Sequence, residues 1–243
     1  MDSLQYAVDH NYRLSIDISH NAALHGHMYI IKYIYEDFLK TSKGKPRWDL
    51  ITCINAARGG HLDILCYLHE RKCPWNIKVY SRAAENGHLP IIRYLVEHEG
   101  CSIKNCESLS WPNNTCSIAA RRGHLSIVRY IYEKGLPCNG EEFFVAVLHG
   151  HLSIVKYLYK KGSWNEEACK YAARGNHLNI LKYLVKKGAV FDEETYRYAV
   201  KNSNLFMIKY LDDLHCPHPN NIVEVAKRES LDEVVDYLLS CSY

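Results

Sequence analysis

Apolar and polar residues follow a helical pattern in a short block that recurs along the chain. One copy reads AARGNHLNILKYLVKKG, from Ala172 to Gly188. In its second part the apolar positions are Leu178, Ile180, Leu181, Leu184 and Val185, and the outward positions are Lys182, Lys186 and Lys187. Spacing by three and four residues puts the apolar positions on one face of a helix. The pattern therefore predicts a helix from Leu178 to about Lys187.

A tyrosine marks the same phase of this helix in every copy. The eight tyrosines are Tyr33, Tyr67, Tyr94, Tyr130, Tyr157, Tyr183, Tyr210 and Tyr237. Successive members are 26 or 27 residues apart, except for two gaps of 34 and 36 residues. The chain is therefore predicted to hold about eight repeats with two insertions, near Thr41 to Arg47 and Glu99 to Ser110.

A shorter helix precedes the Gly-His or Asn-His step of each copy. Its expected N-cap residues, whose side chains can accept hydrogen bonds from free backbone N–H groups, are Asp49, Asn76, Asn139, Asn165 and Asp192. Paired alanines such as Ala172 and Ala173 allow neighbouring helices to approach closely, and the Gly-His step breaks the chain into a turn. Each copy is thus a helical hairpin that buries its apolar face only by stacking on its neighbours.

The four tryptophans keep the same phase as the repeat. Trp48, Trp75, Trp111 and Trp164 each lie eight residues before the first alanine of a copy, and the other copies carry Leu14, Cys138, Phe191 and His218 there. One tryptophan per repeat favours a packing plug between repeats over a ligand cage. If the ring of Trp164 is buried there, Trp164→Ala is expected to destabilise the protein by about 3–5 kcal/mol.

The motif A-A-x-x-G-H-L-x-I-V-x-Y-L-x-x-x-G resembles the ankyrin repeat over essentially the whole chain. With its Cys-Pro-Trp-Asn junction at Cys73 to Asn76, it is similar to the short-repeat ankyrins abundant in giant viruses of amoebae and in some protists. The resemblance implies an all-α, ankyrin-type repeat solenoid of stacked helix-turn-helix units. It also implies a single domain over residues 1–243, with a half-repeat at 1–13 and about eight repeats at 14–243.

Two departures from the family pattern change the expected surface. The ordinary ankyrin period is about 33 residues, and the Thr-Pro-Leu-His opening is missing from every copy. Junctions such as Gly162 to Trp164 are too short for the usual projecting β-hairpin, so few or no β-hairpins are expected. The two insertions are the natural places for protruding loops.

Composition points to a soluble protein that works inside a cell. Hydrophobic residues make up 47% of the chain and charged residues 23%, which is ordinary for a globular protein. No apolar run is long enough for a transmembrane helix, and the N-terminus lacks the features of a signal peptide. Ten cysteines scattered through a chain of this kind favour reduced thiols, and the net charge of +3 is only weakly basic.

The histidines and cysteines offer candidate metal sites, each with a structural explanation. His27, His61, His88, His124, His151 and His177 are the turn histidines of their copies, which indicates hydrogen bonds that stabilise the turn. The best zinc candidate is His98, Cys101, Cys106 and Cys116, but this spacing lacks the close pairs typical of zinc ligands. Cys66 replaces a basic residue of the outer helix and is expected to be exposed and unreactive. No metal or cofactor is predicted.

No catalytic constellation emerges from the sequence. None of the glycine-rich fingerprints for nucleotide phosphates is present. Carboxylate pairs such as Glu166 and Glu167 fall in first helical turns, where they favour the helix dipole. The protein is therefore expected not to be an enzyme.

The residues just before the Gly-His turn carry the candidate binding surface. In ankyrin-like stacks these positions line the inner, concave face, and here they are Arg58, Arg82, Glu85, Arg121, Arg122, His149, Arg174, Lys201 and Arg228. A row of arginines offers bidentate donors to carboxylates or phosphates. We expect a protein partner with an acidic surface or segment, and we expect neither a membrane nor a small-molecule substrate. In a viral setting such a protein would target host proteins in the host cytoplasm.

The sequence is also compatible with two other functions. The same arginines could bind nucleic acid, which would give strong salt dependence and little sequence preference, although few aromatic platforms are expected on that face. A structural role, such as a virion component, would show self-association and no outside partner. The charged stripe could also be an ordinary solvated surface. The outer lysines at positions 156, 160, 182 and 186 are interpreted as solubility residues of the repeat.

Overall fold

The computed structural model describes residues 16–41, 49–98, 112 and 114–241. These residues form sixteen α-helices and no strand, which confirms the predicted all-α repeat fold. The predicted half-repeat at 1–13, the second insertion and all of the first insertion after Thr41 lie outside the described residues.

The helices alternate between a first and a second helix of eight successive hairpins. The first helices are α2 (Ile16–His25), α4 (Leu50–Gly59), α6 (Lys78–Glu85), α8 (Thr115–Arg121), α10 (Glu142–Leu148), α12 (Cys169–Arg174), α14 (Glu193–Lys201) and α16 (Ile222–Arg228). The second helices are α3 (Met28–Thr41), α5 (Leu62–Glu70), α7 (Leu89–His98), α9 (Leu125–Glu133), α11 (Leu152–Lys160), α13 (Leu178–Lys186), α15 (Leu205–Asp213) and α17 (Asp232–Ser240). A short 3-10 turn, η1 (Glu166–Ala168), precedes α12.

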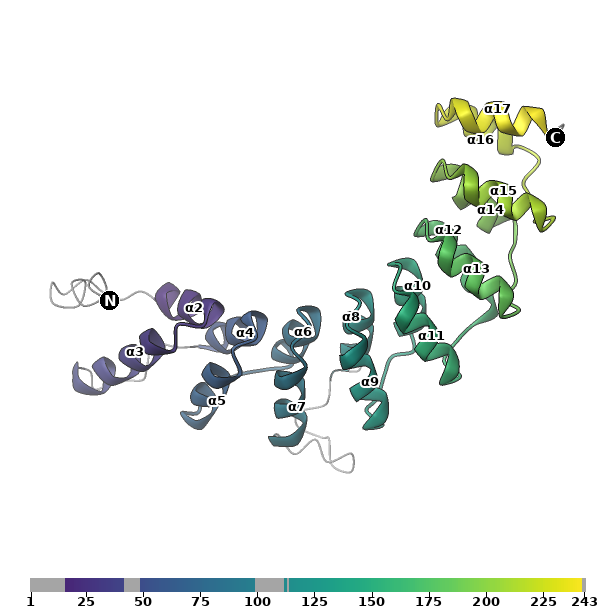
Figure 1. Cartoon of the computed structure of the whole chain (residues 1–243). Helices are drawn as coiled ribbons and strands as arrows, with labels where there is room; N and C mark the ends of the chain where they lie inside the picture. The colour runs from purple at the N-terminus through teal and green to yellow at the C-terminus, as the bar shows by residue number, and fades with distance from the viewer. Residues whose placement is uncertain (1–15, 42–48, 99–111, 113, 242–243) are drawn as a thin grey trace. The chain divides into compact units, whose positions relative to one another are not determined.

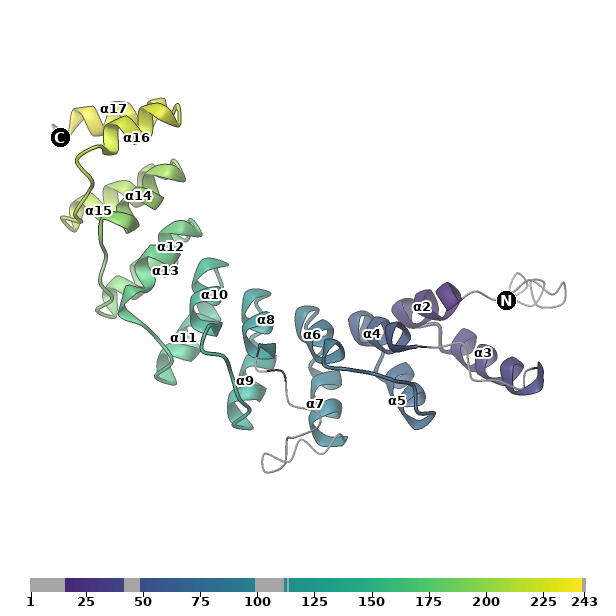
Figure 2. The ribbon, with the colours of Figure 1, turned by 180° about the vertical axis from the view of Figure 1, so that it is seen from behind.

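Small residues explain why the first helices pack on one another. The alanines of each copy, such as Ala56, Ala57, Ala172 and Ala173, have no exposed surface. Without bulky side chains between them, α4 contacts both α2 and α6, and α12 contacts α14 far more extensively than α11 contacts α13. Figures 1 and 2 show the first helices α2, α4 and α6 on one side and the second helices α3, α5 and α7 on the other.

The chain divides into two compact units. Unit 1 comprises residues Met1–Ala119 and Ser126–Cys138, and unit 2 comprises Ala120–Leu125 and Asn139–Tyr243. Within each unit the core is built from the apolar faces of the helices. In α13 the buried side chains are Ile180, Leu181 and Leu184, whereas Lys182, Lys186 and Lys187 are exposed, as the helical spacing predicts.

The predicted capping residues all accept backbone hydrogen bonds near the starts of the first helices. Asp49 and Asp192 form complete capping boxes, in which Thr52 and Thr195 bond back to the capping residue. The side-chain oxygen of Asn165 accepts a hydrogen bond from the Glu167 N–H at 2.7 Å. Asn76 and Asn139 accept in the same way from the N–H two residues later. Asp49 and Asp192 are thus the N-caps of α4 and α14, as predicted, and Asn165 caps η1. By contrast, α6 and α10 begin after Ile77 and Glu141, which make no capping bond, so the predicted caps Asn76 and Asn139 lie one and two residues too early.

The tryptophans are less buried than the packing-plug interpretation requires. Trp75 and Trp164 are half-buried, and each stacks against a ring of the preceding second helix. The ring centroids of Trp75 and His69 are 4.3 Å apart, and those of Trp164 and Tyr159 are 5.1 Å apart. Each of these two tryptophans therefore keeps part of its surface in solvent. Trp48 and Trp111 lie outside the described residues.

Candidate partner-binding surface

In unit 1 the predicted stripe contains one ion pair and one separate arginine. The Arg82 guanidinium lies 2.7 Å from the Glu85 carboxylate, so these two charges largely offset each other. Arg58 is exposed, and its side chain has no ion-pair partner among the residues described. This part of the stripe is therefore only weakly basic.

In unit 2 the predicted stripe is exposed along its whole length. Its members are Arg121, Arg122, His149, Arg174, Lys201 and Arg228, and each of these side chains is exposed. Arg121, Arg174, Lys201 and Arg228 occupy the same position of the first helices α8, α12, α14 and α16, two residues after the first alanine, where α10 carries Leu148. Within the described part of the chain none of these four has an ion-pair partner. Their charges are therefore available to a ligand. We call this set of six residues the basic stripe.

Histidines of the next repeat bond to the backbone at the ends of three first helices, at Arg58, at Leu148 and at Arg121 of the basic stripe. The Nε2 atoms of His88 and His151 donate hydrogen bonds to the carbonyl oxygens of Arg58 and Arg121, at 3.0 and 2.8 Å. His177 donates to the Leu148 carbonyl at 3.1 Å. We expected these histidines to stabilise their own turns, but their ring bonds instead join each repeat to the preceding one.

The turn glycines make room for these histidines. A Cβ added to Gly150 would lie 2.6 Å from the ring of His177, and one added to Gly123 would lie 2.8 Å from the ring of His151. Both glycines also have positive φ angles, of 86° and 82°. The Gly-His step therefore satisfies two needs at once, a left-handed turn and a close approach by the next repeat.

A second row lies beside the basic stripe on the first helices of unit 2. Val145, Tyr171, Tyr198 and Val225 each come three residues before a stripe position or its equivalent, so they share its helix face. All four are half-buried, and the Tyr171 ring packs 4.8 Å from that of Phe144. Sequence reasoning missed this row, although its three-residue offset from the arginines could have indicated it. The surface thus combines positive charge with apolar and aromatic side chains.

His149 is the most constrained member of the stripe. Its Nδ1 donates a hydrogen bond to the carbonyl oxygen of Val145 at 2.9 Å. The ring therefore lies back along its own helix while remaining exposed. His149 can contribute a hydrogen-bond donor to a ligand through Nε2 when that atom carries a proton.

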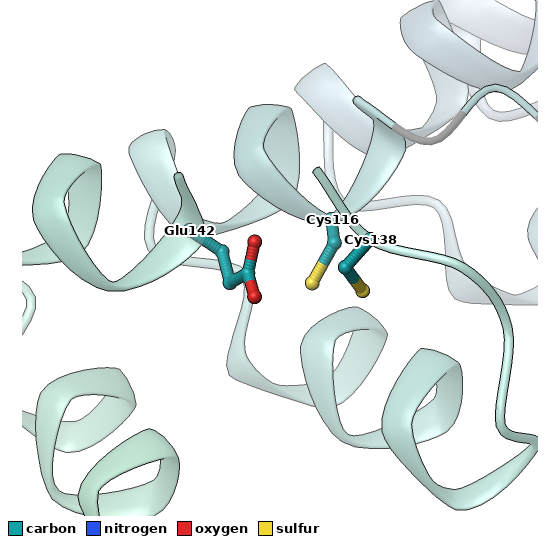
Figure 3. Close-up of side chains that lie close together, drawn as sticks. All are labelled: Cys116, Cys138 and Glu142. Carbon is teal, nitrogen blue, oxygen red and sulfur yellow. The ribbon is translucent and has the colours of Figure 1, made fainter. Parts of the chain in front are cut away.

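Among the described residues, the cysteines do not bring four metal ligands together within one unit. Of the predicted zinc candidates, Cys101 and Cys106 lie outside the described residues, and Cys116 is buried in α8. Figure 3 shows Cys116 and Cys138, whose sulfur atoms lie within 4.8 Å of each other, together with Glu142. Glu142 belongs to unit 2, so unit 1 itself offers two thiols here, fewer than the four ligands of a structural zinc site.

Cys66 differs from its predicted environment. We expected an exposed thiol, but Cys66 is half-buried in the structure. Burial raises the pKa of this thiol, and a hydrogen bond from Tyr94 opposes the rise only in part. Because the thiolate is the reactive form, a raised pKa makes Cys66 a poor nucleophile.

Comparisons with known proteins identify the repeat. The family model described as ankyrin repeats matches in overlapping blocks at residues 53–142, 81–167, 118–195 and 143–243. Among solved structures, the crystal structure of the human ASB11 ankyrin repeat domain is similar, with 16% sequence identity and a TM-score of 0.55. The similarity covers 71% of this chain and 84% of that domain. A search of curated proteins gives no match. In the described ranges no helix is long and apolar enough to cross a membrane.

Proposed function

We propose, because the chain belongs to the ankyrin-repeat family, that it is a non-enzymatic scaffold that binds an acidic surface of another protein through its basic stripe. Ankyrin repeats are generally protein-interaction modules, and a stack of repeats suits this task because its surface residues vary without disturbing the core. The observation that carries the acidic partner is the exposed charge of Arg121, Arg174, Lys201 and Arg228, which have no ion-pair partner among the described residues.

The chemistry of the stripe favours carboxylates. Arginine presents a planar fork of donors that matches a carboxylate in two parallel hydrogen bonds. Arg121, Arg174 and Arg228 offer this geometry from three first helices of one unit. The bonds from His151 to the Arg121 carbonyl and from Asn202 to the Arg174 carbonyl hold the backbone at two of these arginines, which lowers the entropy lost on binding.

The half-buried row beside the basic stripe, which contains Tyr171 and Tyr198, favours a partner that also makes apolar contacts. Tyr171 and Tyr198 keep part of their rings accessible beside the arginines. Tyrosine supplies a large contact area with few rotatable bonds, which suits a protein interface. The proposed partner segment therefore carries acidic side chains together with apolar ones. The insertions near 41–47 and 99–110 extend this surface in the proposal.

We infer that the protein acts inside a cell. Scattered cysteines in a chain of this size support reduced thiols and hence an intracellular setting. The short repeat and the Cys-Pro-Trp-Asn junction support a source like the giant viruses of amoebae or certain protists. In a viral setting, the partner would be a host protein in the host cytoplasm.

A comparison of two surface variants tests the proposal. Partners are captured from nuclease-treated lysate with the wild type, with an Arg121→Glu, Arg122→Glu, Arg174→Glu variant, and with a Lys160→Glu, Lys186→Glu variant as control. Circular dichroism and thermal melting establish that all three are folded. The captured protein is identified, and its dissociation constant is then measured by calorimetry. We expect the arginine variant to lose at least about tenfold in affinity, or about 1.4 kcal/mol, and the control to match the wild type.

Other outcomes point to other functions. Binding that appears only when nucleic acid is left intact, and disappears in the arginine variant, would favour nucleic-acid binding through the stripe. Self-association without an outside partner would favour a structural component such as a virion protein. A captured protein that both variants bind equally well would overturn the assignment of the stripe.

A further inference from the structure

The second helices carry a charge pair at one fixed position of the repeat. In four of them a basic residue is followed four residues later by an acidic one, which places opposite charges on neighbouring turns of the helix. These pairs are Lys32 and Glu36, Arg93 and Glu97, Arg129 and Glu133, and Lys209 and Asp213. All eight of these side chains are exposed. The repeat thus tends to neutralise its outer surface.

Helices α11 and α13 break this pattern in the same way. The acidic position is occupied by Lys160 in α11 and by Lys186 in α13, four residues after Lys156 and Lys182. Neither helix contains an aspartate or a glutamate. Like charges four residues apart destabilise a helix by about 0.2–0.5 kcal/mol. This small loss of helix stability therefore occurs in two adjacent repeats.

The helix dipole does not account for this substitution. A cation at the end of a helix is favourable, but α11 and α13 already have Lys161 and Lys187 there. The α9 repeat places Lys134 at the equivalent position and still keeps Glu133 beside it. Lys160 and Lys186 are therefore additional charges.

The six lysines lie together on one surface of unit 2. We call Lys156, Lys160, Lys161, Lys182, Lys186 and Lys187 the lysine face; each is exposed, and within the described residues none has an ion-pair partner. Helices α11 and α13 are the second helices of adjacent repeats, and they contact each other, although less extensively than α12 contacts α14. Lysines four residues apart are separated by about 6 Å along a helix, and packed helices lie about 8–10 Å apart. The lysine face is therefore a compact grid of positive charges.

Tyrosine rings hold several of these lysines without neutralising them. The Lys156 ammonium lies 5.7 Å from the ring centroid of Tyr183, and that of Lys182 lies 5.1 Å from the centroid of Tyr210. Lys187 lies 5.3 Å from the centroid of Tyr159. A cation–π contact orders an ammonium but leaves its net charge in place, unlike a carboxylate. The grid is thus both charged and partly preorganised.

We propose that the lysine face binds the phosphate backbone of a nucleic acid without regard to sequence. Phosphates are neutralised well by lysine, which acts as a point charge, and a grid with no carboxylates offers no repulsion to a polyanion. The apolar sides of α11 and α13 are buried in the repeat core, so neither helix has an apolar face to insert into a membrane. The nearby Tyr159 and Tyr183 rings are half-buried and pack edge to face against each other, so we assign the contact to the backbone and not to stacked bases.

This surface is distinct from the basic stripe. The lysine face lies on second helices, whereas the stripe lies on first helices. The two proposals therefore stand or fall separately. Together they would let the protein hold a protein partner and a nucleic acid at the same time.

Binding to a labelled 20-base-pair DNA duplex, measured by fluorescence anisotropy between about 50 and 200 mM salt, tests the proposal. The key variant is Lys160→Glu, Lys186→Glu, which restores the residue type that other repeats carry at this position. Each lost phosphate contact reduces the slope of log K against log salt by about 0.9. We expect the double variant to reduce the slope by about 2 and to weaken binding at 0.1 M salt at least about tenfold.

Two matched variants sharpen the result. Asp213→Lys extends the grid to α15, next to the existing Lys209, and should strengthen duplex binding and steepen the slope by about 1. The Arg121→Glu, Arg122→Glu, Arg174→Glu variant should bind the duplex like the wild type.

Wild type that does not bind duplex at 50 mM salt would overturn the proposal, as would a Lys160→Glu, Lys186→Glu variant that binds normally. Loss of duplex binding in the arginine variant alone would move the site to the basic stripe. Binding to phosphatidylserine vesicles but not to duplex would replace nucleic acid with a membrane surface.

Discussion

At the residue scale, the contact between a turn glycine and the next repeat's histidine is the most demanding feature of the fold. Gly150 has a φ of 86°, and the His177 ring fills the space where a Cβ would stand. A positive φ does not by itself require glycine at this position, because Asn176, Ser203 and Ser230 adopt positive φ angles at the equivalent position of other copies. The close approach is therefore the stricter requirement at Gly150.

Two glycine substitutions separate backbone strain from crowding. Gly162 has a φ of 80° but open space around it, so Gly162→Ala adds only the left-handed strain, about 1–2 kcal/mol. Gly150→Ala also displaces His177 from its bond to Leu148, so we expect a total of about 2–3 kcal/mol. Chemical denaturation of both variants measures the difference. Equal losses would show that the histidine moves aside without cost.

His177 gives folding a dependence on pH. Burial lowers the pKa of His177 below its ordinary value of 6.5, and the hydrogen bond to Leu148 opposes this only in part. The unfolded chain therefore binds more protons than the folded protein just below pH 6.5, so stability is fully present above that pH and is lost as pH falls through the lowered pKa. We expect the free energy of unfolding of the wild type to decline towards pH 5 more steeply than that of His177→Asn. Parallel pH profiles would contradict this prediction.

At the element scale, rings at the ends of the second helices α5 and α11 hold the junctions that follow them. Trp164 packs on Tyr159, which meets Tyr183 of the next repeat edge to face, with ring centroids 6.0 Å apart. In unit 1, His69 occupies the repeat position that Tyr159 has in unit 2. Its Nδ1 lies 2.7 Å from the Tyr94 hydroxyl, and its ring stacks on Trp75. The same geometry thus recurs with different side chains.

The half-burial of Trp164 reduces its expected contribution. A fully buried tryptophan replaced by alanine would cost about 3–5 kcal/mol. Because Trp164 keeps part of its surface in solvent, we expect Trp164→Ala to cost about 2 kcal/mol, while Trp164→Phe, which keeps a ring against Tyr159, should cost less than half as much. Urea denaturation of the two variants checks this order. An unchanged midpoint for Trp164→Ala would show that the ring does not contribute to packing.

At the scale of the whole molecule, stability is shared between neighbouring repeats. In unit 2 the α12–α13 hairpin has a described neighbour on each side, whereas the α16–α17 hairpin has one, through α14. In a linear stack each repeat depends on its interfaces with its neighbours. The contribution of each hairpin is therefore unequal along the unit.

The rate of amide hydrogen exchange should reflect the unequal stability of the hairpins in unit 2. Openings of single hairpins require less free energy where one interface is missing. We expect faster exchange in α16 and α17 than in α12 and α13 under native conditions, measured by mass spectrometry of peptic fragments. Uniform protection across unit 2 would indicate that the unit unfolds in one cooperative step.

The sequence by itself determined the fold and its register. The capping residues such as Asp192, the paired alanines and the apolar spacing of α13 act over a few residues, so their roles could be inferred from spacing alone. Repetition then showed that these local patterns belong to stacked units. The exposure of the basic stripe followed from its position in the first helix, although its partner stays a prediction.

Only the tertiary structure decided which side chains of one repeat contact the next repeat. The bond from His177 to Leu148 joins residues 29 positions apart, and the contact of Lys182 with Tyr210 likewise crosses from one repeat to the following one. The half-burial of Trp164 also depends on where the next hairpin sits. These features are set by the offset with which hairpins stack, and that offset results from packing between surfaces that no single repeat contains.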